Sequence, residues 1–137
     1  MMERQLSQRR ILKMANSNTK VCTPNIVSFN CKGFKQRMYN FITESLDKYS
    51  VILLQEHWLY EFQFNNFKKV LPKYSYHALS SMKSDNITRG RGFGGTAILW
   101  KKNLNCSVTP LITMNPRVCA VHMNMNRCDI IIVSVCT

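Results

Sequence analysis

The stretch from Asn25 to Glu56 constrains the fold more than any other part of the chain. NIVSFN (25–30) alternates as a half-buried strand does, and VILLQE (51–56) is apolar enough for a strand buried on both faces. Between them, residues 35–48 are predicted to form an amphipathic helix, because apolar residues recur there at helical spacing. The stripe consists of Met38, Phe41, Ile42, Leu46 and Tyr49. A strand, a helix and a strand in this order predict two parallel neighbours joined by a crossover.

The rest of the chain is predicted to be mostly strands. YSYHALSS (74–81) favours a strand, and residues 82–95 favour a loop. Further strands with short turns, and therefore antiparallel neighbours, are expected at 96–102, 105–113, 117–125 and 129–135. The expected architecture is one mixed sheet with a β-α-β start, in an α/β or α+β layer.

Charge indicates a polyanionic partner. The chain has 19 Lys and Arg against 7 Asp and Glu, a net charge of +12 over 137 residues. Such a balance favours nucleic acid before membrane, although a merely basic soluble protein is the alternative. Residues 1–22 are predicted to be a flexible basic arm, and 23–137 the folded domain. Without an apolar run long enough for a signal peptide or a membrane span, we expect an intracellular protein, nuclear or cytoplasmic, with no membrane partner.

The six cysteines are predicted to be reduced thiols without a disulfide partner. No C-x-x-C motif occurs, and the three histidines show no zinc-ligand spacing with the cysteines. His57 lies next to Glu56, but neighbours on a strand point to opposite faces, so the two cannot easily share an ion. We interpret His57 as a hydrogen-bonded structural residue.

Asn30 and Glu56 are the candidate catalytic residues. Each ends one of the two predicted parallel strands, and ligands gather at the carboxyl ends of such strands. One carboxylate and a neutral amide suit a hydrated Mg²⁺. The alternative is that Asn30 is a turn residue and Glu56 the point where the strand meets water.

The loop TRGRGFGG is the candidate nucleic-acid contact. Arg89 and Arg91 offer bidentate phosphate contacts, and the glycines let the backbone approach a ligand closely. Lys101 and Lys102, just past the next strand, are expected to extend the same basic surface. A solvated hairpin loop is the alternative, and the motif lacks the lysine and hydroxyl residue of a P-loop.

Three segments in order, NIVSFNCKGF, VILLQEHWL and GRGFGGTAILWKKNL, resemble the endonuclease/exonuclease/phosphatase superfamily. They look most like the endonuclease domain of LINE-type (non-LTR) retrotransposons. The resemblance implies the N-terminal half of a two-sheet α/β sandwich that cleaves phosphodiester bonds of DNA with Mg²⁺. It also implies that Glu56 is a metal ligand, that Asn30 lies near metal and phosphate, and that Trp58 anchors the turn behind them.

The superfamily's remaining catalytic residues are expected further along than Thr137, and Cys136 stands where its tyrosine is expected. No general base can be named, so the chain is expected to be a fragment that is inactive on its own. A sheet without its cover would expose an apolar face made of Ile98, Trp100, Val121, Ile131 and Val133 or of the residues that alternate with them, which predicts a poorly soluble or partly molten chain. A non-catalytic nucleic-acid-binding module, a sugar- or lipid-phosphate phosphatase and a functionless remnant of a mobile element are the alternative functions.

Overall fold

The computed structural model describes residues 24–83, 92–125 and 128–137, so the predicted arm (1–22) lies outside the described residues. The elements follow the sequence closely: β1 (Ile26–Asn30), α1 (Gln36–Phe41), the π-helical turn η2 (Ile42–Leu46), β2 (Val51–Gln55), the 3₁₀ turn η3 (Glu61–Gln63), α2 (Asn65–Val70), β3 (Tyr74–Leu79), β4 (Thr96–Lys101), β5 (Ser107–Leu111), β6 (Val118–Met125) and β7 (Cys128–Val135). The helices among the described residues are all too short or too polar to cross a bilayer.

The strands form two sheets, which confirms an α/β fold but corrects the expected single sheet. Sheet A has the order β1-β2-β4-β3, with β1 and β2 parallel and the other pairs antiparallel. Sheet B is antiparallel, with the order β5-β6-β7. The chain starts a second sheet after β4 because β4 already pairs with β2 on one side and with β3 on the other. No free edge remains beside it, so the chain turns away after Lys101 and starts a second sheet.

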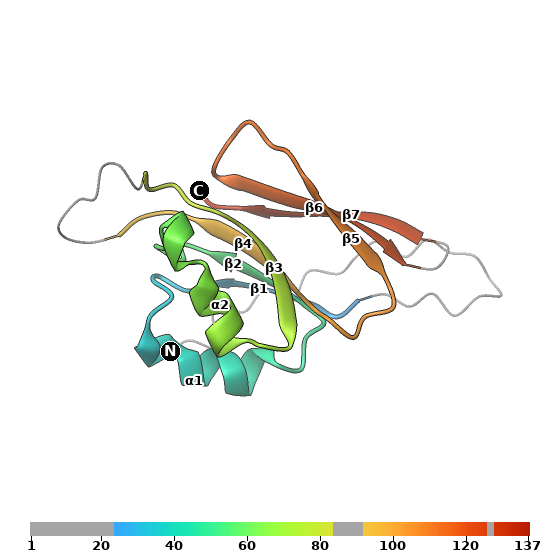
Figure 1. The fold of residues 1–137 in the computed structure, drawn as a ribbon, viewed down its shortest axis with the longest axis horizontal. Helices are drawn as coiled ribbons and strands as arrows, with labels where there is room; N and C mark the ends of the chain where they lie inside the picture. Colours follow the sequence, from blue (N-terminus) through green and yellow to red (C-terminus); the bar gives the residue numbers. More distant parts are fainter. Residues whose placement is uncertain (1–23, 84–91, 126–127) are drawn as a thin grey trace.

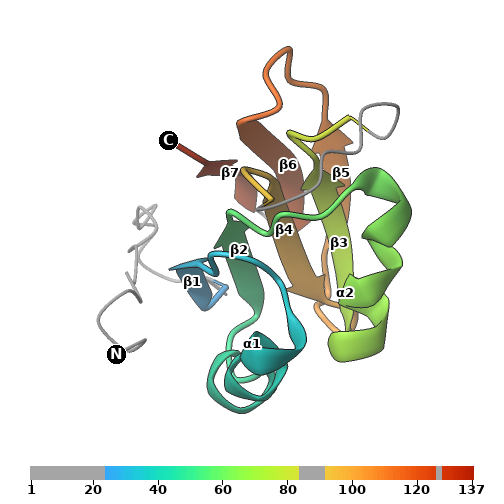
Figure 2. The same cartoon turned by 90° about the vertical axis from the view of Figure 1, so that its left-hand side faces the viewer.

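The molecule is built in three layers (Figures 1 and 2). The two helices cover one face of sheet A, and sheet B covers the other face. Alternate residues of β2 serve the two interfaces: Ile52 and Leu54 pack under the helices, and Val51 and Leu53 pack against sheet B. Burial on both faces explains why β2 is an unbroken apolar run.

The predicted amphipathic helix is confirmed, but its second half widens. Met38, Ile42 and Leu46 are all buried and lie four residues apart. Four residues per repeat exceeds the 3.6 of an α-helix, so a regular helix would carry the stripe off the sheet. The change from α1 to the π-helical η2 corrects this drift and keeps the three side chains on sheet A.

One row of exposed apolar side chains lies on the outer side of sheet B. Ile98 and Val121, expected to be uncovered, are fully buried between the two sheets, so that expectation is wrong for them. On β7, whose free edge borders the sheet, Ile131, Val133 and Val135 are 62%, 45% and 51% exposed. The inner faces of the two sheets cover each other, and the exposed apolar row of Ile131, Val133 and Val135 lies on the outer face of sheet B.

Candidate active site at the carboxyl edge of the parallel strands

The structure brings Asn30 and Glu56 together. β1 and β2 pair in register from Ile26 opposite Val51 to Asn30 opposite Gln55, so both strands end at the same edge. The Asn30 Nδ2 amide donates a hydrogen bond to the Glu56 Oε2 carboxylate oxygen. The backbone N–H of Lys32 donates to Asn30 Oδ1 at 3.1 Å and fixes the orientation of the amide. A carboxylate is thereby held in one position at the sheet edge.

Glu56 ends the strand through an unusual backbone conformation. Its φ is +54°, which costs a residue with a Cβ roughly 1–2 kcal/mol relative to the right-handed region. Two donors from the β1–α1 loop hold its carbonyl: the Gly33 N–H at 2.8 Å and the Cys31 thiol at 3.4 Å. Gly33 itself has φ +100°, which glycine adopts readily. The loop after β1 therefore stabilises the bend that ends β2.

Gln55 ties the site to the second sheet. Its Nε2 donates to the Ser134 Oγ of β7 at 2.9 Å, and its Oε1 accepts from the Ser28 Oγ of β1 at 3.3 Å. Ser134 is only 1% exposed. Sequence reasoning missed this pair, although a signal existed: Gln55 follows Val51 and Leu53 in the alternation that faces sheet B, where a polar residue needs a partner.

His57 is a structural residue, as predicted. It is fully buried, its Nε2 lies 2.8 Å from the Leu79 carbonyl oxygen, and its Nδ1 accepts the Leu59 N–H at 2.9 Å. Burial lowers the pKa of His57 from 6.5 to about 4, so the ring is neutral at pH 7. Both nitrogens are engaged in loop contacts, which leaves none to move a proton at the site.

Trp58 joins three loops at the same edge, in agreement with its expected role as an anchor. A Cβ built on Gly33 or on Gly92 would come within 2.7 Å of its side chain, so both backbones lie against it. The Lys35 Nζ lies 5.3 Å from the centre of the ring, within range of a cation–π contact. Trp58 thus packs the β1–α1 loop and residue 92 onto the segment that follows Glu56.

Of the four predicted basic contacts, the structure describes only Lys101 and Lys102. Arg89 and Arg91 lie outside the described residues. Because β4 runs antiparallel to β2, Thr96 lies opposite Gln55, whereas the Lys101 N–H bonds to the Ser50 carbonyl at the far end of β2. At about 3.3 Å per residue, Lys101 and Lys102 start roughly 16 Å from the edge that carries Glu56, and their role as nucleic-acid contacts stays a prediction.

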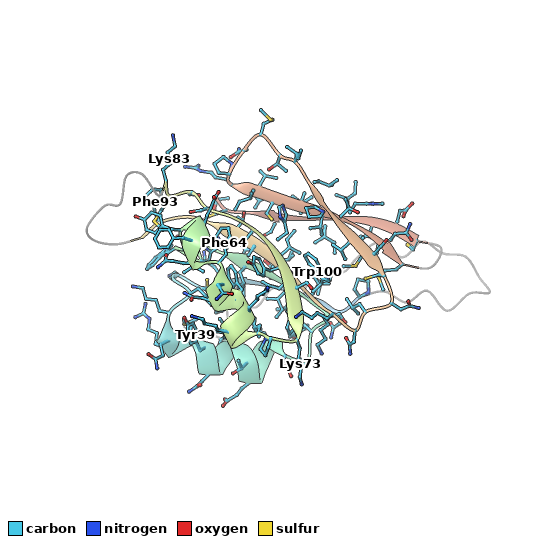
Figure 3. The ribbon with its side chains drawn as sticks, viewed as in Figure 1. Tyr39, Phe64, Lys73, Lys83, Phe93 and Trp100 are labelled. Atoms are coloured by element: carbon cyan, nitrogen blue, oxygen red, sulfur yellow. The ribbon has the colours of Figure 1, made fainter. Side chains whose placement is uncertain are left out.

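Other lysines, not singled out from the sequence, lie at the site edge. Lys32 and Lys35 are exposed in the loop after β1. Lys83 follows Ser81, whose Oγ accepts the Gly95 N–H at 3.1 Å. Figure 3 shows Lys83 and Phe93 at the end of the molecule where the parallel strands finish, far from Lys73. Sequence spacing alone did not reveal this grouping, because Lys83 comes from a different loop, about fifty residues after Lys32 and Lys35.

The site's residues fit a magnesium ion held by a single carboxylate. The described residues contain no group of three or more His, Cys, Asp or Glu side chains that would enclose a metal. Mg²⁺ commonly takes one or two carboxylates and fills its remaining positions with waters and phosphate oxygens, and Glu56 Oε1 accepts no hydrogen bond from the described residues. Glu56 is the carboxylate that would contact such an ion, and the Asn30 amide fixes the position of that carboxylate.

The cysteines at and around the site are thiols. All five described cysteines are free, and Cys22 lies outside the described residues. Burial raises the pKa of Cys31 to about 12, and its thiol donates to the Gln55 and Glu56 carbonyl oxygens. Cys31 therefore stays protonated and supports the loop; it is not a nucleophile.

Comparison with known proteins supports the fold. No protein-family model and no curated protein sequence matches the chain. Among solved structures, the endonuclease domain of TRAS1, a telomere-specific non-LTR retrotransposon, matches 80% of the chain with a TM-score of 0.53 and 16% identity. The AP endonuclease LMAP from Leishmania major matches 80% with a TM-score of 0.54 and 18% identity.

Both neighbours have endonuclease/exonuclease/phosphatase-type folds, so the fold expected from the three motifs is confirmed. The chain spans less than half of either neighbour: 44% of the TRAS1 domain and 39% of LMAP. At these identities the likeness establishes the fold, and the chemistry rests on the residues of this chain.

Proposed function

We propose that the chain supplies the metal-binding part of a Mg²⁺-dependent phosphodiesterase that nicks DNA. The observation that carries this proposal is the fixed pair of Asn30 and Glu56 at the carboxyl edge of two parallel strands. The neighbours with this fold are named as endonucleases, one from a retrotransposon and one for AP sites, which supports a nuclease before a phosphatase.

Each residue of the site has a separate role in this proposal. A bound Mg²⁺ would neutralise the scissile phosphate and polarise an attacking water. Glu56 holds the ion, and Asn30 keeps the carboxylate in place through its Nδ2. The ammonium groups of Lys32 and Lys35 attract the phosphate backbone to the same edge. A DNA substrate also agrees with the net charge of +12. With DNA as the substrate, we propose that the protein acts in the nucleus or the cytoplasm.

The chain is proposed to supply only part of the catalytic set. Among the described residues at the site no general base is available, because both His57 nitrogens are engaged and Cys31 stays protonated. The chain also spans less than half of its structural neighbours. We therefore expect it to bind Mg²⁺ and DNA while nicking slowly or not at all by itself.

A Mg²⁺ titration of the full chain tests the proposal. We expect Glu56→Gln, which removes the charge and keeps the shape, to weaken Mg²⁺ binding at least tenfold in calorimetry. The matched control is Glu44→Gln, an exposed carboxylate on η2, which should bind Mg²⁺ as the wild type does. Equal Mg²⁺ affinity of the wild type and Glu56→Gln would refute the metal site.

A non-catalytic nucleic-acid-binding module is the second candidate, favoured by the lysines at the site edge. It predicts DNA binding that falls steeply with salt and does not respond to Mg²⁺ or to Glu56→Gln. The two candidates separate in one assay. If Mg²⁺ bridges the Glu56 carboxylate and a phosphate, it should raise the DNA affinity of the wild type but not that of Glu56→Gln. If there is no metal site, Mg²⁺ should only screen charge and should lower the DNA affinity of both proteins.

A further inference from the structure

Three aromatic side chains lie near the site edge without a role in the proposed chemistry. Tyr60 and Phe62 stack with their ring centres 5.3 Å apart and their planes 10° from parallel. Phe62 is 63% exposed and Phe93 is 54% exposed. Large aromatic rings are usually buried, because each removes 150–250 Å² of apolar surface from water. Exposure of two of them on neighbouring segments indicates a surface that binds something flat and apolar.

The two segments lie side by side next to Glu56. The Trp58 N–H donates to the Gly94 carbonyl at 3.0 Å, and Gly92 lies against the Trp58 side chain. Residues 92–95 therefore run along the segment that joins Glu56 to Tyr60. Phe93 lies on one of these segments, and the stacked pair begins on the other, four residues after Glu56.

The backbone under the stacked pair is fixed. The Tyr60 N–H donates to Gln63 Oε1 at 3.0 Å, and the Gln63 N–H donates to the Tyr60 carbonyl at 2.9 Å. One residue earlier, the Leu59 carbonyl accepts the Ser80 hydroxyl at 2.7 Å. A ring pair held on a closed turn loses little conformational freedom when a ligand stacks on it, which favours binding.

The lysines near these aromatic rings indicate which kind of ligand the surface binds. Lys35 lies over Trp58, and Lys83 lies at the same end of the molecule as Phe93 (Figure 3). Aromatic faces beside ammonium groups match a polyanion that carries flat rings. In an intact duplex the bases stack on one another and show only their edges, so only unpaired bases can lie on an aromatic side chain.

We infer that Tyr60, Phe62 and Phe93 form a stacking surface for unpaired bases of single-stranded DNA beside the Asn30–Glu56 pair. This inference rests on the proposed function for its nucleic-acid partner and adds the substrate form: a strand that is single or locally unpaired next to the scissile phosphate. The rings bind the bases, and the lysines bind the backbone that leads to the carboxylate.

Binding of three labelled probes to the full chain in EDTA, without metal or cleavage, tests the inference. The probes are an oligothymidylate of about twelve nucleotides, an abasic strand with the same number of phosphates, and a duplex of the same length. We expect the wild type to bind the oligothymidylate about tenfold more tightly than the abasic strand, because stacking on an aromatic ring contributes about that factor per base.

Variants at Phe62 test whether the aromatic ring causes the preference for oligothymidylate over the abasic strand. Phe62→Leu keeps an apolar side chain but removes the ring, so it should bind oligothymidylate as weakly as the abasic strand, while Phe62→Trp should keep the preference. The control is Ile112→Ala, which alters a side chain that is 95% exposed on the β5–β6 loop and should change nothing.

Equal binding of the oligothymidylate and the abasic strand by the wild type would overturn the stacking surface. The proposed metal site would be unaffected by that result, since it is tested by the Mg²⁺ titration of Glu56→Gln. Failure to bind any of the three probes would overturn both the stacking surface and the DNA partner.

Discussion

Among the described residues, three other than glycine have a positive φ, and all three lie in the loops of the candidate site. They are Lys32, Glu56 and Trp58, with φ of +44°, +54° and +59°. Such conformations persist only where surrounding contacts hold them, and they gather where function needs a fixed geometry. Here the contacts are those of the β1–α1 loop and residues 92–95, so the position of the carboxylate depends on loops outside its own strand.

At the residue scale, His57 makes stability depend on pH. Its pKa in the folded chain is about 4 against 6.5 unfolded, so as the pH falls the unfolded chain takes up the proton first. The free energy of unfolding should therefore decrease between pH 6.5 and 4, by about 3 kcal/mol from this group, and the loss should stop below pH 4. Urea unfolding at a series of pH values measures it.

Two variants test whether His57 causes this change of the free energy of unfolding with pH. His57→Asn should be less stable at pH 7 and should lose the part of the pH dependence between 6.5 and 4. His122→Gln, at a partly exposed histidine 3.4 Å from Asp129, should keep it. An unchanged slope in His57→Asn would show that other groups cause it.

At the scale of elements, the site depends on contact between the sheets. Gln55 of β2 reaches Ser134 of β7 directly beneath the residue that carries the carboxylate, although 79 positions separate the two in sequence. β7 contributes no ligand of its own to the pair of Asn30 and Glu56. Its part is to hold the end of β2 through this hydrogen bond, beside the apolar packing of Val51 and Leu53 against sheet B.

Ser134→Ala tests this connection. It leaves the partly buried Gln55 amide without its acceptor, which should lower the free energy of unfolding by about 1–3 kcal/mol. We also expect a weaker affinity for Mg²⁺, because the end of β2 becomes less ordered. Ser107→Ala on the exposed strand β5 should alter neither quantity. Calorimetry of metal binding, together with urea unfolding, separates a local effect on the site from a general loss of stability.

At the scale of the whole molecule, charge is divided between two ends of sheet A. Lys32, Lys35 and Lys83 lie at the edge with Glu56, and Lys101 and Lys102 lie at the opposite edge. If DNA binds to a uniform basic surface, the lysines at both ends of sheet A contribute to the affinity. If DNA binds at the carboxyl edge, only the lysines at the end that carries Glu56 contribute. The net charge of +12 alone does not distinguish these cases.

Two double variants with equal charge loss make the distinction. Lys32→Gln with Lys35→Gln should weaken DNA binding about tenfold and reduce the slope of log affinity against log salt by about two. Lys101→Gln with Lys102→Gln should change affinity less than threefold. Equal losses in both would mean that DNA contacts the whole sheet and that the predicted contacts at 101 and 102 are correct.

The apolar outer face of sheet B should govern solubility. Ile131→Lys places a charge where the side chain is 62% exposed, so it should raise the concentration at which the chain aggregates without changing the thermal midpoint. Ile132→Lys, at a neighbour that is 4% exposed and faces sheet A, should unfold the domain. Light scattering and circular dichroism give the two readouts. Equal aggregation of the wild type and Ile131→Lys would exclude this face as the cause.

The sequence by itself determined the elements and the candidate pair. Periodicity located every described strand and the stripe of Met38, Ile42 and Leu46, because backbone geometry imposes these patterns locally. The parallel pairing of β1 and β2 followed from their helical crossover, and it brought Asn30 and Glu56 to one edge. The three motifs also indicated the fold that the solved structures share.

Only the tertiary structure decided what depends on the partners of each strand. Pairing on both sides of β4 produced the second sheet, the antiparallel run of β4 carried Lys101 and Lys102 away from the site, and the packing of the sheets joined Gln55 to Ser134. Contacts between residues far apart in the chain leave no local period in the sequence. Their effects on the site, including the grouping of Gly33, Lys35 and Gly92 around Trp58, appear only when the chain is folded.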